Sequence, residues 1–144
     1  MSRTKILLAE DNAADVWLIE EALRRQSLDV EIENYTTAED AINAIQRCGV
    51  ESASVPDLIL LDYNLPTGHG GEVLAAAASN PHLASVPKAI LSSFMRPDES
   101  ERMLGLGACC FIPKPPSLNE FLTVVGRQVN TLLSQPSSSR AVSK

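Results

Sequence analysis

The ten residues from Asp57 to Pro66 have the sequence Asp-Leu-Ile-Leu-Leu-Asp-Tyr-Asn-Leu-Pro, and they decide the fold. A strand with one wet face alternates in polarity, so the apolar run 58–61 predicts a strand buried on both faces, as in a parallel sheet. The following Asn, Pro and Gly residues indicate a turn. We therefore expect Asp62 at the carboxyl end of a central strand, where open α/β sheets form their ligand sites. From this segment alone, a purely structural role for Asp62 as a turn cap remains an alternative.

The composition is that of a single globular domain. The chain has 144 residues, of which 44% are hydrophobic and 21% are charged, typical of a soluble protein with one core. Twelve basic and 18 acidic residues give a net charge of −6, which argues against non-specific binding to nucleic acid or to an anionic membrane. No apolar run approaches the roughly 20 residues of a membrane span. The first residues lead into a strand without a signal-peptide core, so we expect a cytoplasmic protein.

The three cysteines, Cys48, Cys109 and Cys110, are odd in number and lack Cys-x-x-Cys spacing. We interpret them as reduced thiols, neither disulfide partners nor metal ligands. Trp17 falls opposite the apolar stripe of its predicted helix, and we expect it to be exposed.

Apolar segments alternate with helical patterns along the whole chain. Strands are predicted at residues 5–9, 30–35, 58–61, 87–92 and 108–112, and the helices start after Asn12, at Thr37, near Gly71, at Pro97 and after Ser117. Asp15 is expected to complete a capping box with Asn12. Five strands alternating with five helices predict a parallel sheet covered on both faces. Segment 30–35 alternates in polarity, which indicates an edge strand and favours the flavodoxin-like strand order 2-1-3-4-5. Residues 1–133 are expected to form this domain, and the Ser-rich residues 134–144 a disordered tail.

Polar residues follow four of the predicted strands. Because parallel strands deliver their carboxyl ends to one edge of the sheet, we expect these side chains to converge there: Glu10 and Asp11 after the first strand, Asp62 and Asn64 after the third, Ser92 after the fourth, and Lys114 after the fifth. Each has a structural interpretation when taken alone, as a solvated turn, a helix cap or a surface charge. Their joint occurrence at one edge favours a site.

The predicted group of side chains has the chemistry of phosphoryl transfer. Three carboxylates close together repel one another unless a cation lies among them, and oxygen ligands with an open side favour Mg²⁺. Lys114 suits a phosphoryl oxygen as a point charge, and the hydroxyl of Ser92 can donate to another. An oxygen nucleophile would attack in line while these groups meet the charge of the phosphoryl oxygens. That nucleophile would be Asp62, giving an aspartyl phosphate.

With these motifs in place, the sequence resembles the receiver domains of two-component response regulators. The matching pieces are Glu10-Asp11 after an apolar strand, Asp62 in L-I-L-L-D-Y-N-L-P, Ser92 after A-I-L, and Lys114-Pro115 after C-F-I-P. The resemblance covers roughly residues 5–133. The start E-D-N-A-A-D-V, the segment D-Y-N-L-P and the long loop before the third strand are most similar to single-domain regulators paired with bacterial phytochromes.

The resemblance implies a role for each matching residue. Asp62 would accept a phosphoryl group from a histidine kinase, and the similarity to regulators paired with bacterial phytochromes implies a kinase of the phytochrome type. Asp11, Asp62 and the backbone carbonyl of Asn64 would hold Mg²⁺ with support from Glu10. Lys114 would contact the phosphoryl group, ahead of a cis bond to Pro115.

The resemblance also implies a switch. Ser92 would move to bond the phosphate, and Phe111 would rotate inward behind it. Two positions depart from the common pattern: Ser92 stands where Thr is frequent, and Phe111 stands where Tyr is frequent and cannot form a hydrogen bond. Output would be a changed protein-interaction surface formed by helix 97–106, strand 108–112 and the last helix. Phe94, Met95, Val124 and Leu133 lie near or beside this surface and could serve a homodimer or another partner, but ordinary packing is the favoured interpretation of Val124 and Leu133.

Two other functions remain as alternatives. An aspartyl-phosphate phosphohydrolase would need a second acid two residues after its nucleophile, and Asn64 cannot shuttle a proton. A receiver-like module that is never phosphorylated is disfavoured by the intact acidic pair, acceptor and lysine. We therefore expect no enzyme activity beyond the protein's own phosphorylation and dephosphorylation.

Overall fold

The structure is a computed structural model that describes residues 3–50, 54–65 and 68–135. Its elements follow one another along the chain as β1 (Thr4–Ala9), α1 (Ala13–Arg25), β2 (Val30–Tyr35), α2 (Ala38–Arg47), β3 (Leu58–Asp62), β4 (Asn64–Leu65), β5 (Gly68–His69), α3 (Gly70–Ala78), the 3₁₀ helix η1 (Pro81–Leu83), β6 (Lys88–Ser92), α4 (Pro97–Gly105), β7 (Cys110–Pro113) and α5 (Leu118–Ser134). Pro66, which contributed to the predicted turn, and most of the predicted tail lie outside the described residues, so the tail stays a prediction.

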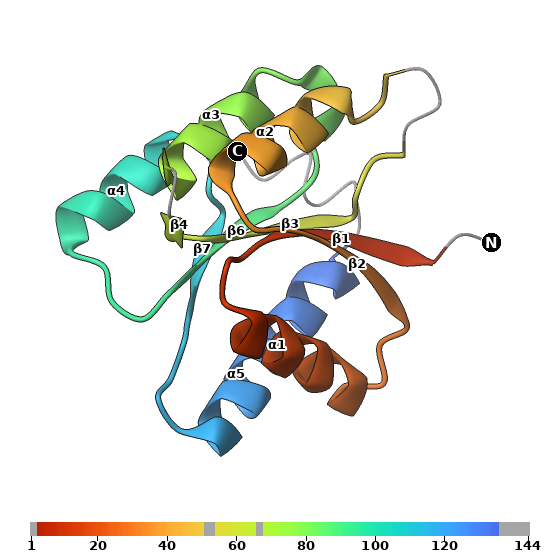
Figure 1. Cartoon of the computed structure of the whole chain (residues 1–144), viewed down its shortest axis with the longest axis vertical. Coiled ribbons are helices and arrows are strands. Elements are labelled where there is room, and N and C mark those ends of the chain that lie inside the picture. Colours follow the sequence, from red (N-terminus) through yellow and green to blue (C-terminus); the bar gives the residue numbers. More distant parts are fainter. Residues whose placement is uncertain (1–2, 51–53, 66–67, 136–144) are drawn as a thin grey trace.

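Five parallel strands form one sheet in the order β2-β1-β3-β6-β7, which confirms the predicted flavodoxin-like order. Figure 1 shows α1 and α5 on one face of the sheet and α2, α3 and α4 on the other. β2 lies at an edge and is only partly buried, as its alternating sequence predicted. The short antiparallel hairpin of β4 and β5 was not predicted.

The central strand β3 lies between two cores. Leu58 and Leu60 pack with the α1 and α5 side, whereas Ile59 and Leu61 pack with the α2, α3 and α4 side. All four side chains have no exposed surface. The unbroken apolar run therefore has the physical cause inferred from the sequence, which is burial on both faces of a parallel sheet.

Side-chain caps fix where the helices begin. Asn12 Oδ1 accepts the backbone N–H groups of Ala14 and Asp15, and Thr37 and Ser117 cap α2 and α5 in the same way. These bonds satisfy donors that have no partner inside the helix. The predicted capping box of α1 is wrong, however, because the backbone N–H of Asn12 donates to Glu10 Oε2 at 3.1 Å. The carboxylate of Asp15 instead accepts a hydrogen bond from Lys114.

α1 and α5 pack closely because α5 carries Gly126 at the contact. A Cβ atom at this position would lie 2.8 Å from the backbone oxygen of Ala22 in α1. Trp17, also in α1, is 58% exposed, as predicted. Among the described residues, none of the helices has both the length and the apolar character to cross a bilayer.

Candidate functional site

The carboxyl ends of β1 and β3 bring three acidic side chains together. Ligand atoms of Glu10, Asp11 and Asp62 lie within 4.8 Å of one another. Glu10 has no exposed surface and Asp62 is 6% exposed, whereas Asp11 is exposed. The predicted convergence of these residues is thus found in the structure, with one side of the cluster open to solvent.

Backbone and side-chain amide contacts hold Asp62 and the acidic loop, residues 10–12 between β1 and α1, in place. The N–H of Glu10 donates to the Tyr35 carbonyl at 3.0 Å, which extends the pairing of β1 with β2 by one residue. The side-chain amide of Asn34 donates to the Glu10 carbonyl at 3.2 Å. Asp62 Oδ1 accepts the N–H of Asn64 at 3.1 Å, which orients that carboxylate at the end of β3. The acidic residues are therefore positioned by the sheet itself.

Lys114 lies among the carboxylates. Its Nζ donates to Glu10 Oε1 at 2.6 Å and to Asp15 Oδ2 at 3.0 Å, and it lies 3.4 Å from Asp62 Oδ2. The backbone N–H of Lys114 donates to the Ser92 carbonyl at 3.0 Å, which continues the pairing of β6 with β7. The predicted proximity of Lys114 to Asp62 is confirmed.

Asp15 is the residue of this cluster that the sequence reasoning missed. It was assigned to a helix cap, yet its carboxylate pairs with Lys114 from the first turn of α1. Its position one helical turn beyond Asn12 would have indicated that it faces back toward the acidic loop.

The resemblance implied a cis bond between Lys114 and Pro115, and this is wrong for the structure. No cis peptide bond occurs in the described part of the chain, so the bond is trans, the isomer favoured by about 0.5–1 kcal/mol at an X–Pro bond. With this trans bond, the ammonium group of Lys114 reaches the carboxylates of Glu10, Asp15 and Asp62.

Burial and charge act in opposite directions within the cluster. Burial raises the pKa of Glu10 to about 7; the hydrogen bond from Lys114 lowers it and the neighbouring Asp62 raises it. Burial by itself lowers the pKa of Lys114, but its hydrogen bond to Glu10 and the charges of Glu10 and Asp62 raise it above its usual value. Lys114 therefore stays charged and offsets part of the carboxylate repulsion.

Ser92 and Phe111 lie at or beside the site but do not touch Asp62 through any contact that the structure describes. The Ser92 hydroxyl donates to the Phe94 carbonyl at 2.8 Å and accepts the Phe94 N–H at 3.1 Å. Phe111, in β7, is half-buried against the core on the α2, α3 and α4 side. Phe94 itself is 74% exposed. In this state Ser92 is thus engaged with the loop before α4.

The donor set fits a hard divalent cation. Three carboxylate oxygens at mutual distances below 4.8 Å, one of them exposed, provide a few hard ligands and room for water, which is the coordination that Mg²⁺ and Mn²⁺ prefer. Asn64, the first residue of β4 and two residues after Asp62, is exposed, and its backbone carbonyl is the further ligand that the resemblance implied. A cation bound there would also remove the repulsion that remains after the charge of Lys114 is counted.

These observations describe a doubly wound α/β domain with an acidic site, suited to a divalent cation, and a lysine at the carboxyl edge of its sheet. The chain belongs to the response regulator receiver domain family, whose pattern matches residues 6–126. It is therefore a receiver domain of a two-component system, with a CheY-like fold.

The similar proteins are response regulators, and one of them is a phytochrome response regulator. The chain is 34% identical over 121 residues to response regulator Rcp1 of Synechocystis sp., covering 83% of this chain and 82% of Rcp1. The phosphorylated cyanobacterial phytochrome response regulator RcpA has a similar structure, with a TM-score of 0.82 and 36% identity over 92% of this chain and 96% of RcpA. The Mn²⁺-bound form of Rcp1 gives a TM-score of 0.81 and 31% identity over 92% of this chain and 96% of that one.

Proposed function

We propose that this protein is a phosphorylation-driven signalling switch in which Asp62 accepts a phosphoryl group from a histidine kinase. The observation that carries this proposal is the 3.4 Å separation of Lys114 Nζ and Asp62 Oδ2 inside a cluster of carboxylates. An oxygen of Asp62 forms a bond to phosphorus while the phosphorus–nitrogen bond of the kinase's phosphohistidine breaks. The similar structures of phosphorylated RcpA and of Mn²⁺-bound Rcp1 support the same chemistry by analogy.

We propose Mg²⁺ as the cation, held by Glu10, Asp11, Asp62 and the Asn64 carbonyl. When bound, it supplies positive charge that offsets the charge of the phosphoryl oxygens in the transition state. Lys114 supplies a second positive charge, 3.4 Å from Asp62 Oδ2. Because Lys114 is already held by Glu10 and Asp15, little reorganisation is needed to bring it to a phosphoryl oxygen.

Ser92 connects the phosphate to the surface. A serine hydroxyl has one hydrogen to donate, and that hydrogen now bonds the Phe94 carbonyl. If the hydroxyl donates to a phosphate on Asp62, the bond to Phe94 breaks, and the loop that precedes α4 loses a constraint. Phosphorylation would in this way shift the population of conformations around α4, β7 and α5, with Phe111 repacking without any hydrogen bond.

The decisive experiment uses a small acyl phosphate donor with Mg²⁺ and follows phosphorylation of the wild type and of Asp62→Asn. We expect one hydroxylamine-labile phosphoryl group per chain in the wild type, its loss in Asp62→Asn, and its loss in a chelator. Asp98→Asn, which changes an exposed aspartate in α4, is the matched control and should label normally. Equal labelling of wild type and Asp62→Asn would refute the acceptor assignment.

The partners form a further part of the proposal. We propose a phytochrome-type histidine kinase as the donor because Rcp1 and RcpA are similar over most of this chain, and a homodimer or another protein as the target of the surface around α4, β7 and α5. Transfer from a phytochrome kinase that is no faster than from an unrelated histidine kinase would contradict the first part. A solution mass unchanged by beryllofluoride, a phosphate mimic, would contradict homodimer switching.

We propose no turnover of an external substrate. Asn64 occupies the position at which a phosphohydrolase would carry its second acid, and an amide cannot act as the general acid or base. Steady hydrolysis of phosphate esters by the purified protein would contradict this.

A further inference from the structure

Two adjacent thiols meet at the start of the edge strand β7. Cys109 Sγ and Cys110 Sγ lie 3.6 Å apart, although successive side chains of a strand point to opposite faces. Cys109 precedes the first residue of β7, so its side chain does not follow the alternation of the strand and turns toward Cys110. Cys109 is exposed and Cys110 is half-buried, so a reagent can reach the pair.

The surroundings favour a thiolate at Cys109. The backbone N–H of Cys109 donates to the Lys88 carbonyl at 2.8 Å. The hydrogen bond from Cys110 lowers the pKa of Cys109 to about 7, burial opposes this, and the charge of Lys88 helps. The same hydrogen bond, with burial, raises the pKa of Cys110. At neutral pH one sulfur is thus ready to react and the second is held beside it.

The distance between the two sulfurs can be compared with the distances required by a disulfide and by two sulfurs bound to one centre. A disulfide needs about 2.05 Å between its sulfurs, so closing one would require the two sulfurs to move about 1.5 Å closer than they lie here. Two sulfurs that bind one centre at about 2.3 Å lie about 3.4–3.8 Å apart, for an angle between about 95° (a pyramidal centre) and about 110° (a tetrahedral centre). The observed 3.6 Å therefore matches a chelate without movement of the strand.

We propose that Cys109 and Cys110 form a two-sulfur chelate site for one soft, thiophilic centre, such as a trivalent organoarsenical. With an arylarsenoxide, two S–H bonds break and two arsenic–sulfur bonds form. The arsenoxide oxygen takes both protons and leaves as water, and arsenic stays trivalent. The site lies at the opposite end of β7 from Lys114, and it does not depend on phosphorylation of Asp62.

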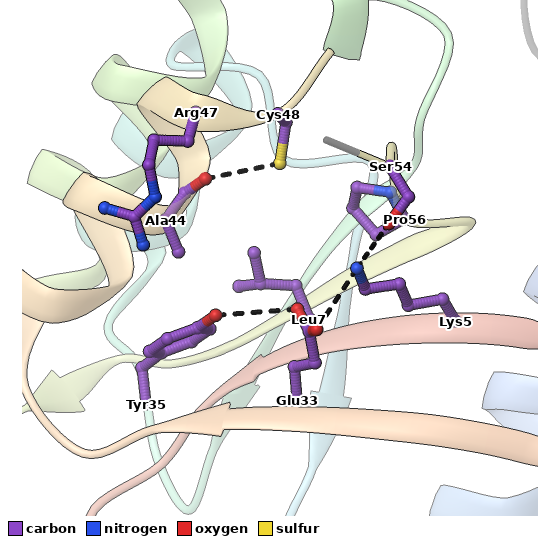
Figure 2. A pocket seen from close by; sticks show the side chains of 9 residues that line it. All are labelled: Lys5, Leu7, Glu33, Tyr35, Ala44, Arg47, Cys48, Ser54 and Pro56. Carbon is purple, nitrogen blue, oxygen red and sulfur yellow. Dashed lines mark hydrogen bonds and ion pairs between the residues drawn. The ribbon is translucent and has the colours of Figure 1, made fainter. Parts of the chain in front are cut away.

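Cys48 provides a matched control within the same chain. It is 6% exposed, and its thiol donates to the Ala44 carbonyl at 3.4 Å. This thiol borders a pocket of about 240 Å³ that is also lined by Lys5 and Tyr35. Figure 2 shows these side chains on the α2 side of β1. Burial raises the pKa of Cys48, so this lone thiol is neither paired nor activated.

The test is a titration of the reduced Cys48→Ser protein with phenylarsine oxide, followed by intact mass and by competition with a monothiol. We expect one arylarsenic per chain with loss of one water, retained against excess monothiol. Adding Cys109→Ser or Cys110→Ser should weaken binding roughly 10²-fold or more, because the second bond of a chelate forms at a high effective concentration. Circular dichroism checks that each variant is folded. Absence of the adduct in Cys48→Ser, or binding within a few-fold of it by both single-thiol variants, would overturn the proposal.

Discussion

Asp62→Asn is expected to stabilise the metal-free protein although it removes the proposed phosphorylation site. Ligand atoms of Glu10 and Asp11 lie within 4.8 Å of the Asp62 carboxylate, and with an effective dielectric constant of about 20 each repels it by at least about 3.5 kcal/mol. Lys114, at 3.4 Å, returns about 5 kcal/mol on the same scale. The net repulsion is about 2 kcal/mol, and the exposure of Asp11 reduces it to about 1–2 kcal/mol. Asparagine keeps an oxygen for the N–H of Asn64.

The assay is urea denaturation in a chelator, at a pH about one unit above the raised pKa of Glu10 so that its carboxylate is ionised. We expect a free energy of unfolding about 1–2 kcal/mol higher for Asp62→Asn than for the wild type. Asp29→Asn, at an 82% exposed carboxylate, should change it by less than about 0.5 kcal/mol.

Millimolar Mg²⁺ should then stabilise the wild type more than the variant, because a ligand that binds only the folded state stabilises it by about 2.7 kcal/mol at a hundred times its Kd. A variant less stable than the wild type in the chelator, or an equal gain from Mg²⁺ in both proteins, would refute the idea that carboxylate repulsion relieved by a cation governs this site.

Three further predictions concern the scaffold. Asn80→Ala should lower the free energy of unfolding, measured in urea, by about 3 kcal/mol. The reason is that the buried side chain of Asn80 makes three hydrogen bonds, two of them to carbonyls at the end of α2. A loss below about 1 kcal/mol would contradict this. Gly126→Ala should lower the free energy of unfolding by about 1–3 kcal/mol, because the added methyl group clashes with α1. Gly105→Ala adds a methyl group in open space, so it should leave the free energy of unfolding unchanged or raise it by up to about 1 kcal/mol. A larger loss of stability for Gly105→Ala than for Gly126→Ala would be inconsistent with the packing. Burial lowers the pKa of Lys88, so the unfolded state binds more protons, and stability should rise with pH from the folded pKa up to about 10.4. Lys88→Met should flatten that rise in thermal melts across the same range, and an unchanged slope would argue against it.

Much of the scaffold could be predicted because its signals are local. The buried run before Asp62, the polarity of β2 and the caps at Asn12, Thr37 and Ser117 each depend on a few neighbouring residues. The site residues could be grouped because a parallel sheet brings its carboxyl ends to one edge. The hairpin of β4 and β5 could not be predicted in this way, because its two-residue strands are too short to show a period.

The partners of single side chains depend on contacts distant in sequence. Asp15 was interpreted as a capping residue, and its ion pair with Lys114, 99 positions later in the sequence, places it in the site. The cysteines were interpreted only as reduced thiols, from their odd number and spacing. That two of the sulfurs meet depends on where β7 begins, which places Cys109 outside the strand. The hydroxyl of Ser92 was likewise expected near the phosphate, and its present partner in the loop before α4 is a property of the folded backbone.

Patterns of neighbouring residues were enough to predict the class of fold, the order of the strands and the set of polar groups at one edge of the sheet. Hydrophobic periodicity and the residues that follow each strand can be recognised without knowing any long-range contact. Tertiary structure decided which of these groups touch: Lys114 on Glu10 and Asp15 as well as Asp62, Ser92 on Phe94, and α5 against α1 at Gly126. The physical reason is range. Periodicity and capping act over a few residues, whereas ion pairs and close packing join side chains whose separation is set only when the helices close on both faces of the sheet.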